Sequence, residues 1–379
     1  MEDRIDTIFI QNIVTPYRSH FFNTLNRVYP FFEVFYMDTT ETDRNWDISK
    51  IELAHNHWID AKGVNVKIGW YKGHFNPILL YKLLNSKNVK NIVLAVSWAD
   101  PNIIIISFAK LLHLTSKRIF FWAEANYLAE WSKKHNSRFK WWLKRKVFSA
   151  VDGAMIIPGK MSSITFEKWN IPVKSYIMLP NTIDDSKLRY TKMYKTPNSI
   201  PEFLIPIRII EKIKGVLNFF NAIGPENINK CIFHIAGDGE DIEMYKEYIK
   251  DNDLSNHIIL EGFCEFEKMN ELYNRCDALI LPSYSDPSPL SIVEALYFHK
   301  PILCSSHCGN HFEAVKDGVN GYTFSPLDKN DIKEKFELFL SKSLFWNAMG
   351  EDSFKIYESE FNTVSVVDRF VQSFNKIKK

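Results

Sequence analysis

One segment of the chain, residues 281–295, places two carboxylates beside the expected start of a helix. A buried strand is predicted to end shortly before Asp286, and a helix is predicted to begin soon after it, so that Glu294 falls in the second helical turn. The free N–H groups of Leu290 and Ser291, with the helix dipole, would form an anion site suited to a diphosphate. Glu294 could accept both hydroxyls of a ribose, and Asp286 could accept those of a sugar. The alternative is structural, with Asp286 in a turn and Glu294 on a solvated helix face.

A second group of residues combines cations with glycine at the end of an earlier predicted strand. Arg208 and Lys214 precede Gly215, which opens the next predicted helix. A diphosphate leaving group requires cations that neutralise its charge and a backbone that approaches it closely. The alternative interpretation of the same residues is an exposed basic loop. Gly237 and Gly239, after the next strand, add a second glycine turn, which is weak support when taken alone.

The elements that must position these residues alternate between strand and helix. Predicted strands cover 7–13, 31–37, 92–96, 118–122, 154–157, 203–209, 231–236, 257–260, 278–281 and 301–304. Predicted helices cover 20–28, 215–223, 241–250, 267–275 and 290–298, and another begins at Pro101 with Asp100 as its N-cap. This alternation predicts an α/β protein with parallel sheets covered by helices, whose ligands bind at the carboxyl ends of the strands.

Two such blocks, joined by a linker-like stretch at 179–201, predict two doubly wound, Rossmann-like domains facing a cleft. We expect an N-terminal domain over 1–182 and a C-terminal domain over 183–360, with a helix over 361–379 that packs back on the first domain. Residues 1–180 carry 24 lysines and arginines against 15 acidic residues, and the remainder carries 23 against 30. This asymmetry predicts domains with different partners.

The C-terminal half resembles the nucleotide-sugar-binding domain of family 4 retaining glycosyltransferases, which have the GT-B fold. The matching motifs, in order, are Arg208…Lys214-Gly215, Ala236-Gly-Asp-Gly239, Leu260-Glu-Gly-Phe263, Asp286-x7-Glu294, Gly309…Glu313 and Asp317-Gly-Val-Asn-Gly-Tyr322. The family usually has Glu-x7-Glu, where this chain has Asp286 as the first acid. The resemblance implies that Glu294 binds the ribose, that Asp286 binds the donor sugar, and that Arg208 and Lys214 bind the diphosphate. Gly237, Leu290 and Ser291 belong to the same donor site, and the backbone at Gly262 and Phe263 would pass the base.

The N-terminal half is similar to the same family in a shorter stretch. The loop after the first strand, which contains Asn12, Pro16, Tyr17 and Arg18, resembles the Pro-Tyr-Arg loop of its envelope-polysaccharide transferases and implies an acceptor-side role. Many members carry a catalytic histidine near the position of Glu124. The resemblance therefore makes Glu124 the candidate replacement for that histidine. The catalytic residues that it implies are Glu124, Asp286, Arg208 and Lys214. The alternative for Glu124 is a structural role as an acid that caps a helix.

Basic charge peaks over 133–146, where aromatic and aliphatic residues from Phe139 to Ala150 recur at helical spacing between the cations, which predicts a basic amphipathic helix. Cations with tryptophan at an interface suit an anionic membrane surface, and Lys140, Lys144 and Arg145 are the residues expected to hold it. The alternative is a packed helix with a solvated basic edge. No nucleic-acid motif accompanies the charge, so nucleic acid is not an expected partner.

The remaining chemistry concerns cysteine. Five cysteines without a recognisable secretory signal predict reduced thiols. Cys304, His307, Cys308 and His311 have a spacing that could bind zinc, but a buried strand at Cys304 favours packing. We therefore expect no metal site at these residues, and the resemblance to GT-B glycosyltransferases implies no cofactor beyond the nucleotide-sugar donor. No unbroken stretch of about 20 apolar residues is present, so no membrane span is predicted.

Together these features predict a retaining glycosyltransferase, a hexosyltransferase of the bacterial envelope or capsule type. It would transfer a sugar from a UDP- or GDP-sugar to a hydroxyl of a lipid-linked polysaccharide or oligosaccharide, without a required divalent metal. Its expected place is the cytoplasm, peripheral on the inner face of the cell membrane. The alternatives are a nucleotide-sugar epimerase or hydrolase of the same fold, or a catalytically silent scaffold of an envelope-assembly complex.

Overall fold

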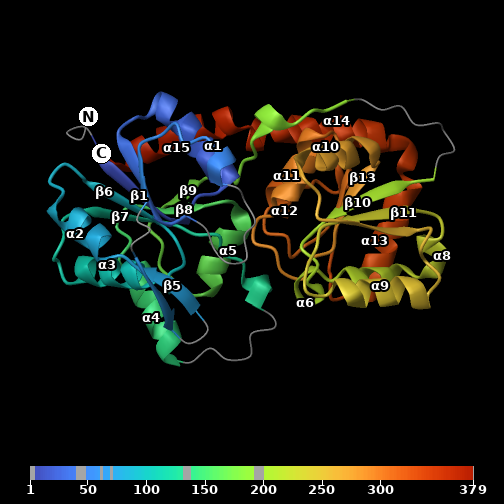
Figure 1. Ribbon diagram of the computed structural model, residues 1–379, viewed down its shortest axis with the longest axis horizontal. Coiled ribbons are helices and arrows are strands. Elements are labelled where there is room, and N and C mark those ends of the chain that lie inside the picture. The colour runs from blue at the N-terminus through green and yellow to red at the C-terminus, as the bar shows by residue number, and fades with distance from the viewer. Residues whose placement is uncertain are drawn as a thin grey trace.

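The computed structural model describes residues 5–39, 48–59, 63–68, 71–130, 138–191 and 200–378 of the 379-residue chain. Within these ranges the chain forms a seven-stranded sheet, a six-stranded sheet and a two-stranded hairpin. Figure 1 shows two lobes side by side, the blue-to-green lobe built around the first sheet and the yellow-to-orange lobe around the second. The final helix, drawn in red, lies on the first lobe.

The first sheet has the strand order β3-β2-β1-β6-β7-β8-β9, and all its pairings are parallel. Its strands are β1 (Thr7–Ile13), β2 (Phe32–Asp38), β3 (His57–Ile59), β6 (Asn91–Ala95), β7 (Arg118–Trp122), β8 (Met155–Ile157) and β9 (Tyr176–Met178). Its helices are α1 (Pro16–Val28), α2 (Pro77–Asn85), α3 (Pro101–Leu111), α4 (Arg138–Ser149) and α5 (Lys160–Lys168), and β4 (Val64–Ile68) pairs with β5 (Tyr71–Phe75) as an antiparallel hairpin.

Both faces of this first sheet are buried. Successive side chains of a strand point to opposite faces, so each strand contributes apolar residues to both sides. In β7, Phe120 packs against Phe374 on one face, with ring centroids 4.8 Å apart. Its neighbour Phe121 packs against Phe148 of α4 on the other, also at 4.8 Å. Two apolar clusters therefore sandwich the sheet and fix where its strands end.

The second sheet has the order β12-β11-β10-β13-β14-β15 and is again parallel. Its strands are β10 (Glu202–Pro206), β11 (Ile232–Ala236), β12 (Ile258–Gly262), β13 (Ala278–Leu281), β14 (Ile302–Ser305) and β15 (Gly321–Phe324). Its helices are α6 (Glu211–Lys214), α7 (Val216–Ile223), α8 (Pro225–Ile228), α9 (Ile242–Asp251), α10 (Phe266–Arg275), α11 (Leu290–Tyr297), α12 (His311–Ala314), α13 (Lys329–Ser341) and α14 (Trp346–Ile356). One continuous apolar core joins them.

The last helix, α15 (Thr363–Lys378), belongs by its contacts to the first domain, although it follows the second in sequence. Phe370 and Phe374 are fully buried in the cluster that also contains Phe9 and Phe120. The Arg118 guanidinium donates a 2.5 Å hydrogen bond to the carbonyl oxygen of Ile377, which anchors the end of the helix beside β7. The chain therefore runs from the first domain to the second and back.

The predicted elements recur in the structure with small shifts. Asp100 accepts a hydrogen bond from the backbone N–H of Asn102, so its predicted N-cap role in α3 is confirmed. The first helix begins at Pro16 rather than at His20, because proline with its fixed φ suits the first helical position. Strands β3, β4, β5, β9 and β15 were not predicted, since three to five residues carry too little periodicity. Among the described residues, no helix has the length and apolarity needed to cross a membrane.

Candidate functional site between the two domains

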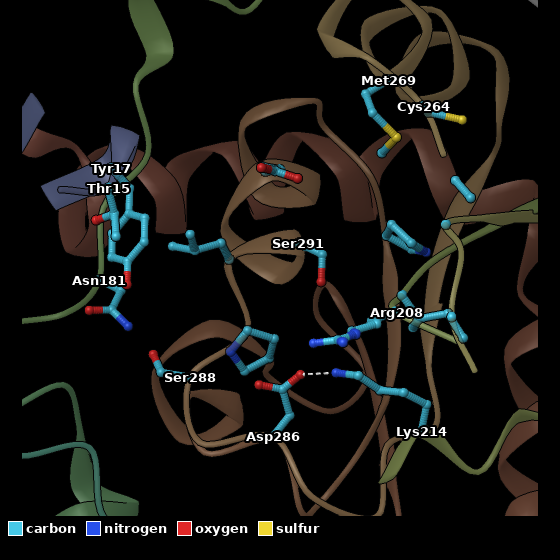
Figure 2. A pocket seen from close by; sticks show the side chains of 18 of the residues that line it. Thr15, Tyr17, Asn181, Arg208, Lys214, Cys264, Met269, Asp286, Ser288 and Ser291 are labelled. Atoms are coloured by element: carbon cyan, nitrogen blue, oxygen red, sulfur yellow. Dashed lines mark hydrogen bonds and ion pairs between the residues drawn. The ribbon is translucent and has the colours of Figure 1, made fainter. Parts of the chain in front are cut away.

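A cavity of about 810 Å³ lies between the two domains, at the carboxyl ends of strands from both sheets. We call it the interdomain cleft. Its lining includes Asn12, Ile13, Thr15, Tyr17, Glu124 and Asn181 from the first domain and Arg208, Lys214, Gly237, Phe263, Asp286, Ser288, Leu290, Ser291 and Glu294 from the second. Figure 2 shows Tyr17 and Asn181 on one side of it and Arg208 and Lys214 on the other. The predicted donor residues thus converge on one site, apart from Gly262.

Lys214 and Asp286 form an ion pair at the floor of the interdomain cleft. The Lys214 Nζ lies 2.6 Å from Asp286 Oδ2, and the two side chains are 16% and 15% exposed. Figure 2 shows this pair as a dashed line, with the Arg208 side chain pointing into the cleft from the same side as Lys214. An anionic ligand here would contact the cations of Arg208 and Lys214, and Lys214 is already paired with the Asp286 carboxylate.

The loop around Lys214 is positioned by a glycine. Gly215 ends α6 with φ +61°, a left-handed conformation that favours glycine. A Cβ at Gly215 would come within 2.9 Å of the Tyr284 ring, and the Tyr284 N–H donates a 2.9 Å hydrogen bond to the Ile213 carbonyl. The loop that carries Asp286 therefore docks directly on the turn that carries Lys214.

Helix α11 directs its N-terminus into the interdomain cleft. Pro289 is its N-cap and makes no side-chain capping hydrogen bond. Leu290 and Ser291, the first helical residues, line the cleft. The first N–H groups of a helix lack intrahelical partners and carry the positive end of the dipole. With Arg208 and Lys214 nearby, the N-terminus completes a positively charged surface suited to a diphosphate.

Glu294 reaches the cleft from the second turn of α11. The Tyr273 hydroxyl donates a hydrogen bond of 2.6 Å to Glu294 Oε2, which fixes the orientation of the carboxylate and leaves Oε1 to a ligand. Burial raises the pKa of the Glu294 carboxyl above its usual range, opposed by the hydrogen bond from Tyr273. This geometry excludes the alternative of a solvated helix residue.

Two glycines bring backbone close to the cleft. A Cβ at Gly237 would lie 1.7 Å from the Ile207 carbonyl oxygen, so only glycine fits there, and the Gly237 N–H donates to the Gly262 carbonyl at 2.8 Å. Gly262 itself does not line the cleft; its φ of +70° turns the chain so that Phe263, 68% exposed, does. Phe263 presents an exposed ring at the site where the base was expected.

On the first-domain side, Glu124 follows β7 and is held by two donors. Arg18 Nη2 donates to Glu124 Oε1 at 2.6 Å, and Asn181 Nδ2 donates to the same oxygen at 3.0 Å. Asn12 and Tyr17 line the cleft as the loop resemblance implied, whereas Pro16 and Arg18 do not. Pro16 starts α1, and Arg18 is buried behind Glu124. Glu124 caps no helix; it faces the ligand space.

The structure bears on two further interpretations of the sequence, the packing of the Cys304 cluster and the surface position of Lys144. Cys304 and Cys308 are fully buried, the His307 and His311 rings each contact a backbone carbonyl through Nδ1, and no metal-ligand group among the described residues includes any of these four. Lys144, expected on a membrane-facing surface, is instead 6% exposed, with its ammonium 3.0 Å from the Trp169 ring centroid. Its position on the inner side of α4 places its cation among tryptophans, so its proposed lipid contact is wrong.

Sequence reasoning missed several residues of this site. Tyr273 and Asn181 orient the two glutamates, and Ser288 lines the cleft next to α11. Asn126 joins the domains by donating from Nδ2 to the His307 carbonyl at 2.8 Å. Ser288 and Asn126 were within reach of the sequence because they sit beside predicted strand ends or helix starts. Tyr273 and Asn181 had no such signal, because their roles depend on tertiary contacts.

Part of the chain is similar to known glycosyltransferases. Residues 195–355 match the family of glycosyl transferases group 1. An uncharacterized glycosyltransferase of Methanocaldococcus jannaschii is 29% identical over 149 residues, which is 39% of this chain and 41% of the relative. The chain thus spans about two fifths of that relative's length.

Solved structures similar to the whole chain define its fold. The lipopolysaccharide outer core galactosyltransferase WaaB in its apo form has a TM-score of 0.73 and 15% identity, covering 98% of this chain and 99% of its own. The HepE protein of Anabaena in complex with UDP has a TM-score of 0.72 and 14% identity, covering 98% and 100%. The chain has the GT-B fold, with two parallel sheets facing a cleft.

Proposed function

We propose that this protein is a retaining glycosyltransferase that uses a nucleotide-sugar, a UDP- or GDP-sugar, as its donor. The observation that carries the proposal is the convergence of Arg208, the Lys214–Asp286 pair, the N-terminus of α11 and Glu294 in one cleft. Each supplies what one part of such a donor needs: cations and N–H groups for the diphosphate, and a carboxylate for the ribose. The match of residues 195–355 to glycosyl transferases and the likeness to a UDP-bound protein support it.

In the proposed reaction, the bond between the anomeric carbon and the diphosphate oxygen breaks as negative charge develops on the diphosphate. Arg208, Lys214 and the N–H groups of α11 stabilise that charge and so lower the barrier. The acceptor hydroxyl forms the new bond on the same face of the sugar, and its proton passes to the departing diphosphate oxygen. Asp286 holds the donor sugar. These cations supply the positive charge that a required divalent metal would otherwise provide.

Glu124 would take the position facing the reacting centre from the first domain. Its carboxylate is fixed by Arg18 and Asn181 and is 30% exposed on the cleft side. We propose that it accepts a hydrogen bond from a sugar hydroxyl and orients it, in place of the family's histidine.

We further propose a lipid-linked glycan as acceptor, presented at an anionic membrane surface. Helix α4 exposes Phe139 (68%) and Trp142 (48%), whose ring centroids lie 5.8 Å apart, beside exposed Arg145 and Lys146. Exposed aromatic rings next to cations suit the boundary between headgroups and acyl chains. The structural likeness to a lipopolysaccharide galactosyltransferase supports the same class of acceptor.

The experiment that tests the proposal screens UDP- and GDP-sugars for thermal stabilisation of the purified protein, then follows the best donor by NMR with a panel of acceptors. The expected result is stabilisation by one nucleotide class and a product that keeps the anomeric configuration of the donor. Release of free sugar with no transfer to any acceptor would favour the hydrolase alternative. Inverted product would contradict the retaining mechanism.

A further inference from the structure

A second cavity, of about 370 Å³, lies within the first domain beside the interdomain cleft. It sits over the carboxyl ends of β1, β6 and β7 and is closed on one side by α4 and Trp169. Asn12, Tyr17 and Glu124 line both cavities, so the two spaces meet at the carboxylate proposed to orient a sugar hydroxyl. A group bound in the second cavity would therefore be next to the reacting centre.

The charged lining of the second cavity is mainly positive among the residues that the structure describes. It contains Arg18 and Lys144 as cations and Glu124 as its carboxylate. Arg18 pairs with Glu124 at 2.6 Å and also lies over the Trp122 ring, 3.7 Å from its centroid. Lys144 is the second cation, and the described lining keeps a net positive charge.

Lys144 is held within aromatic rings. Its ammonium is 3.0 Å from the ring centroid of Trp169, 4.9 Å from that of Trp141 and 6.0 Å from that of Trp98. Aromatic faces attract a cation and also keep water from it, so an anion that reaches Lys144 meets a charge less screened than one on the surface. Trp98 and Trp169 also offer flat apolar walls in a cavity of the size that takes a small ligand.

A neutral donor completes the lining. Gln11, at the end of β1, is 4% exposed, and its Nε2 has no hydrogen-bond partner among the described residues. A buried amide donor without an acceptor is costly, and such groups call for an explanation such as an absent ligand. Gln11 thus adds a donor to the two cations, and acceptor atoms on a ligand would satisfy it.

We propose that the second cavity binds the sugar next to the reacting hydroxyl through a negative charge on that sugar, a phosphate or a carboxylate, with Lys144 recognising the charge. The proposal rests on the glycosyltransferase function proposed above and adds the acceptor's chemical class: an anionic glycan. Lys144 would select the acceptor rather than take part in the reaction, because it lies on the far side of Glu124 from the donor site. Lys144 is buried on the inner side of α4, so this role is separate from any membrane contact made by the exposed face of the same helix.

The test measures binding by calorimetry, in the presence of UDP, for three probes: glucose 1-phosphate, glucuronic acid and methyl glucoside. Lys144→Met keeps the apolar stem and removes the charge, and Lys146→Met, at an exposed position of the same helix, is the matched control. We expect Lys144→Met to weaken at least one anionic probe tenfold or more and to leave methyl glucoside and UDP unchanged. The anionic probe that binds the wild type with the higher affinity shows whether the recognised group is a phosphate or a carboxylate.

Three results would overturn the proposal: no binding of either anion by the wild type, unchanged anion affinity in a folded Lys144→Met, or equal weakening of all three probes. If Lys144→Met does not fold, Gln11→Leu provides the second variant, and it should weaken the same anions. Absence of binding of both UDP and GDP by the wild type would instead count against the donor site, and the anion result would still stand. The two proposals therefore fail separately.

Discussion

The backbone N–H of Lys160 donates a hydrogen bond of 2.8 Å to the carboxylate of Glu313, which ties the start of α5 in the first domain to α12 in the second. A Cβ at Gly159 would meet Glu313 Oε2 at 2.5 Å, so glycine permits the approach. The contact places a carboxylate at a helix N-terminus, where the dipole favours negative charge. Glu313 is therefore one of the side chains, with Asn126, that hold the two domains in their relative position.

The first prediction concerns pH and Glu313. Burial raises its folded-state pKa, so its contribution to stability is full below the unfolded pKa and is lost as the pH rises through the folded pKa. In Glu313→Gln the amide oxygen can still accept the hydrogen bond from Lys160, but the side chain does not titrate. The variant should therefore lack the fall in unfolding free energy that the wild type shows as the pH rises through the folded-state pKa of Glu313. Urea unfolding over about pH 4 to 8 measures it. Glu334→Gln, on an exposed position, is the control; equal curves for wild type and Glu313→Gln would contradict the prediction.

The second prediction concerns the diphosphate. Arg208→Ala should weaken UDP or GDP binding roughly tenfold to a hundredfold, because a hydrogen bond to a charged group contributes about 1.5–3 kcal/mol. Lys212 offers a matched control, since its side chain is 74% exposed and pairs with Glu240 away from the cleft. Calorimetric titration of both variants decides the assignment, and a Lys212→Ala effect as large as that of Arg208→Ala would place the anion elsewhere.

The third prediction concerns Glu294 and the ribose. Since burial raises the pKa of this carboxyl, nucleotide affinity should fall at a pH above the ordinary glutamate range as the acid becomes protonated. Glu294→Gln should bind the nucleotide more weakly at neutral pH and lose this pH dependence. Nucleotide affinity measured across pH for both proteins provides the check. A lower Tm with unchanged affinity would make Glu294 a structural residue.

The fourth prediction concerns the exposed face of α4. Replacing Phe139 and Trp142 with serine should release the protein from anionic vesicles, and Lys140→Glu with Arg145→Glu should do so in a salt-dependent way, at about 1 kcal/mol per cation. Vesicle sedimentation at low and high salt gives the measurement. Serine at Leu344 and Phe345, which are 86% and 60% exposed in the second domain, controls for the loss of surface apolar area. Equal release by this control would exclude a specific membrane face.

The fifth prediction concerns α15. Phe370→Ala should destabilise the first domain by about 3–5 kcal/mol, because it removes a fully buried ring from the cluster around Phe9. Val364→Ala, at a position 57% exposed on the same helix, should change stability little. Thermal unfolding of both variants compares them. Equal Tm values would mean that the helix contributes little to this core.

The sequence predicted the parallel sheets because buried strands give runs of apolar residues that alternate with amphipathic helices, as at β7 and β13. It also predicted the donor side of the cleft, where Asp286 and Arg208 follow strand ends directly. It could not place Lys144, because the helical pattern of α4 contains cations at several angles and only packing against Trp169 decides which is buried. It could not find Tyr273, because its contact with Glu294 depends on how α10 and α11 pack against each other.

The return of α15 to the first sheet has a consequence for synthesis on the ribosome. The core around Phe9 and Phe120 lacks Phe370 and Phe374 until α15 has been translated. The second domain has its whole sheet by residue 324 and can fold while the chain is still growing. The domain encoded second is therefore expected to mature first, and the cleft forms only after α15 has packed on the domain encoded first.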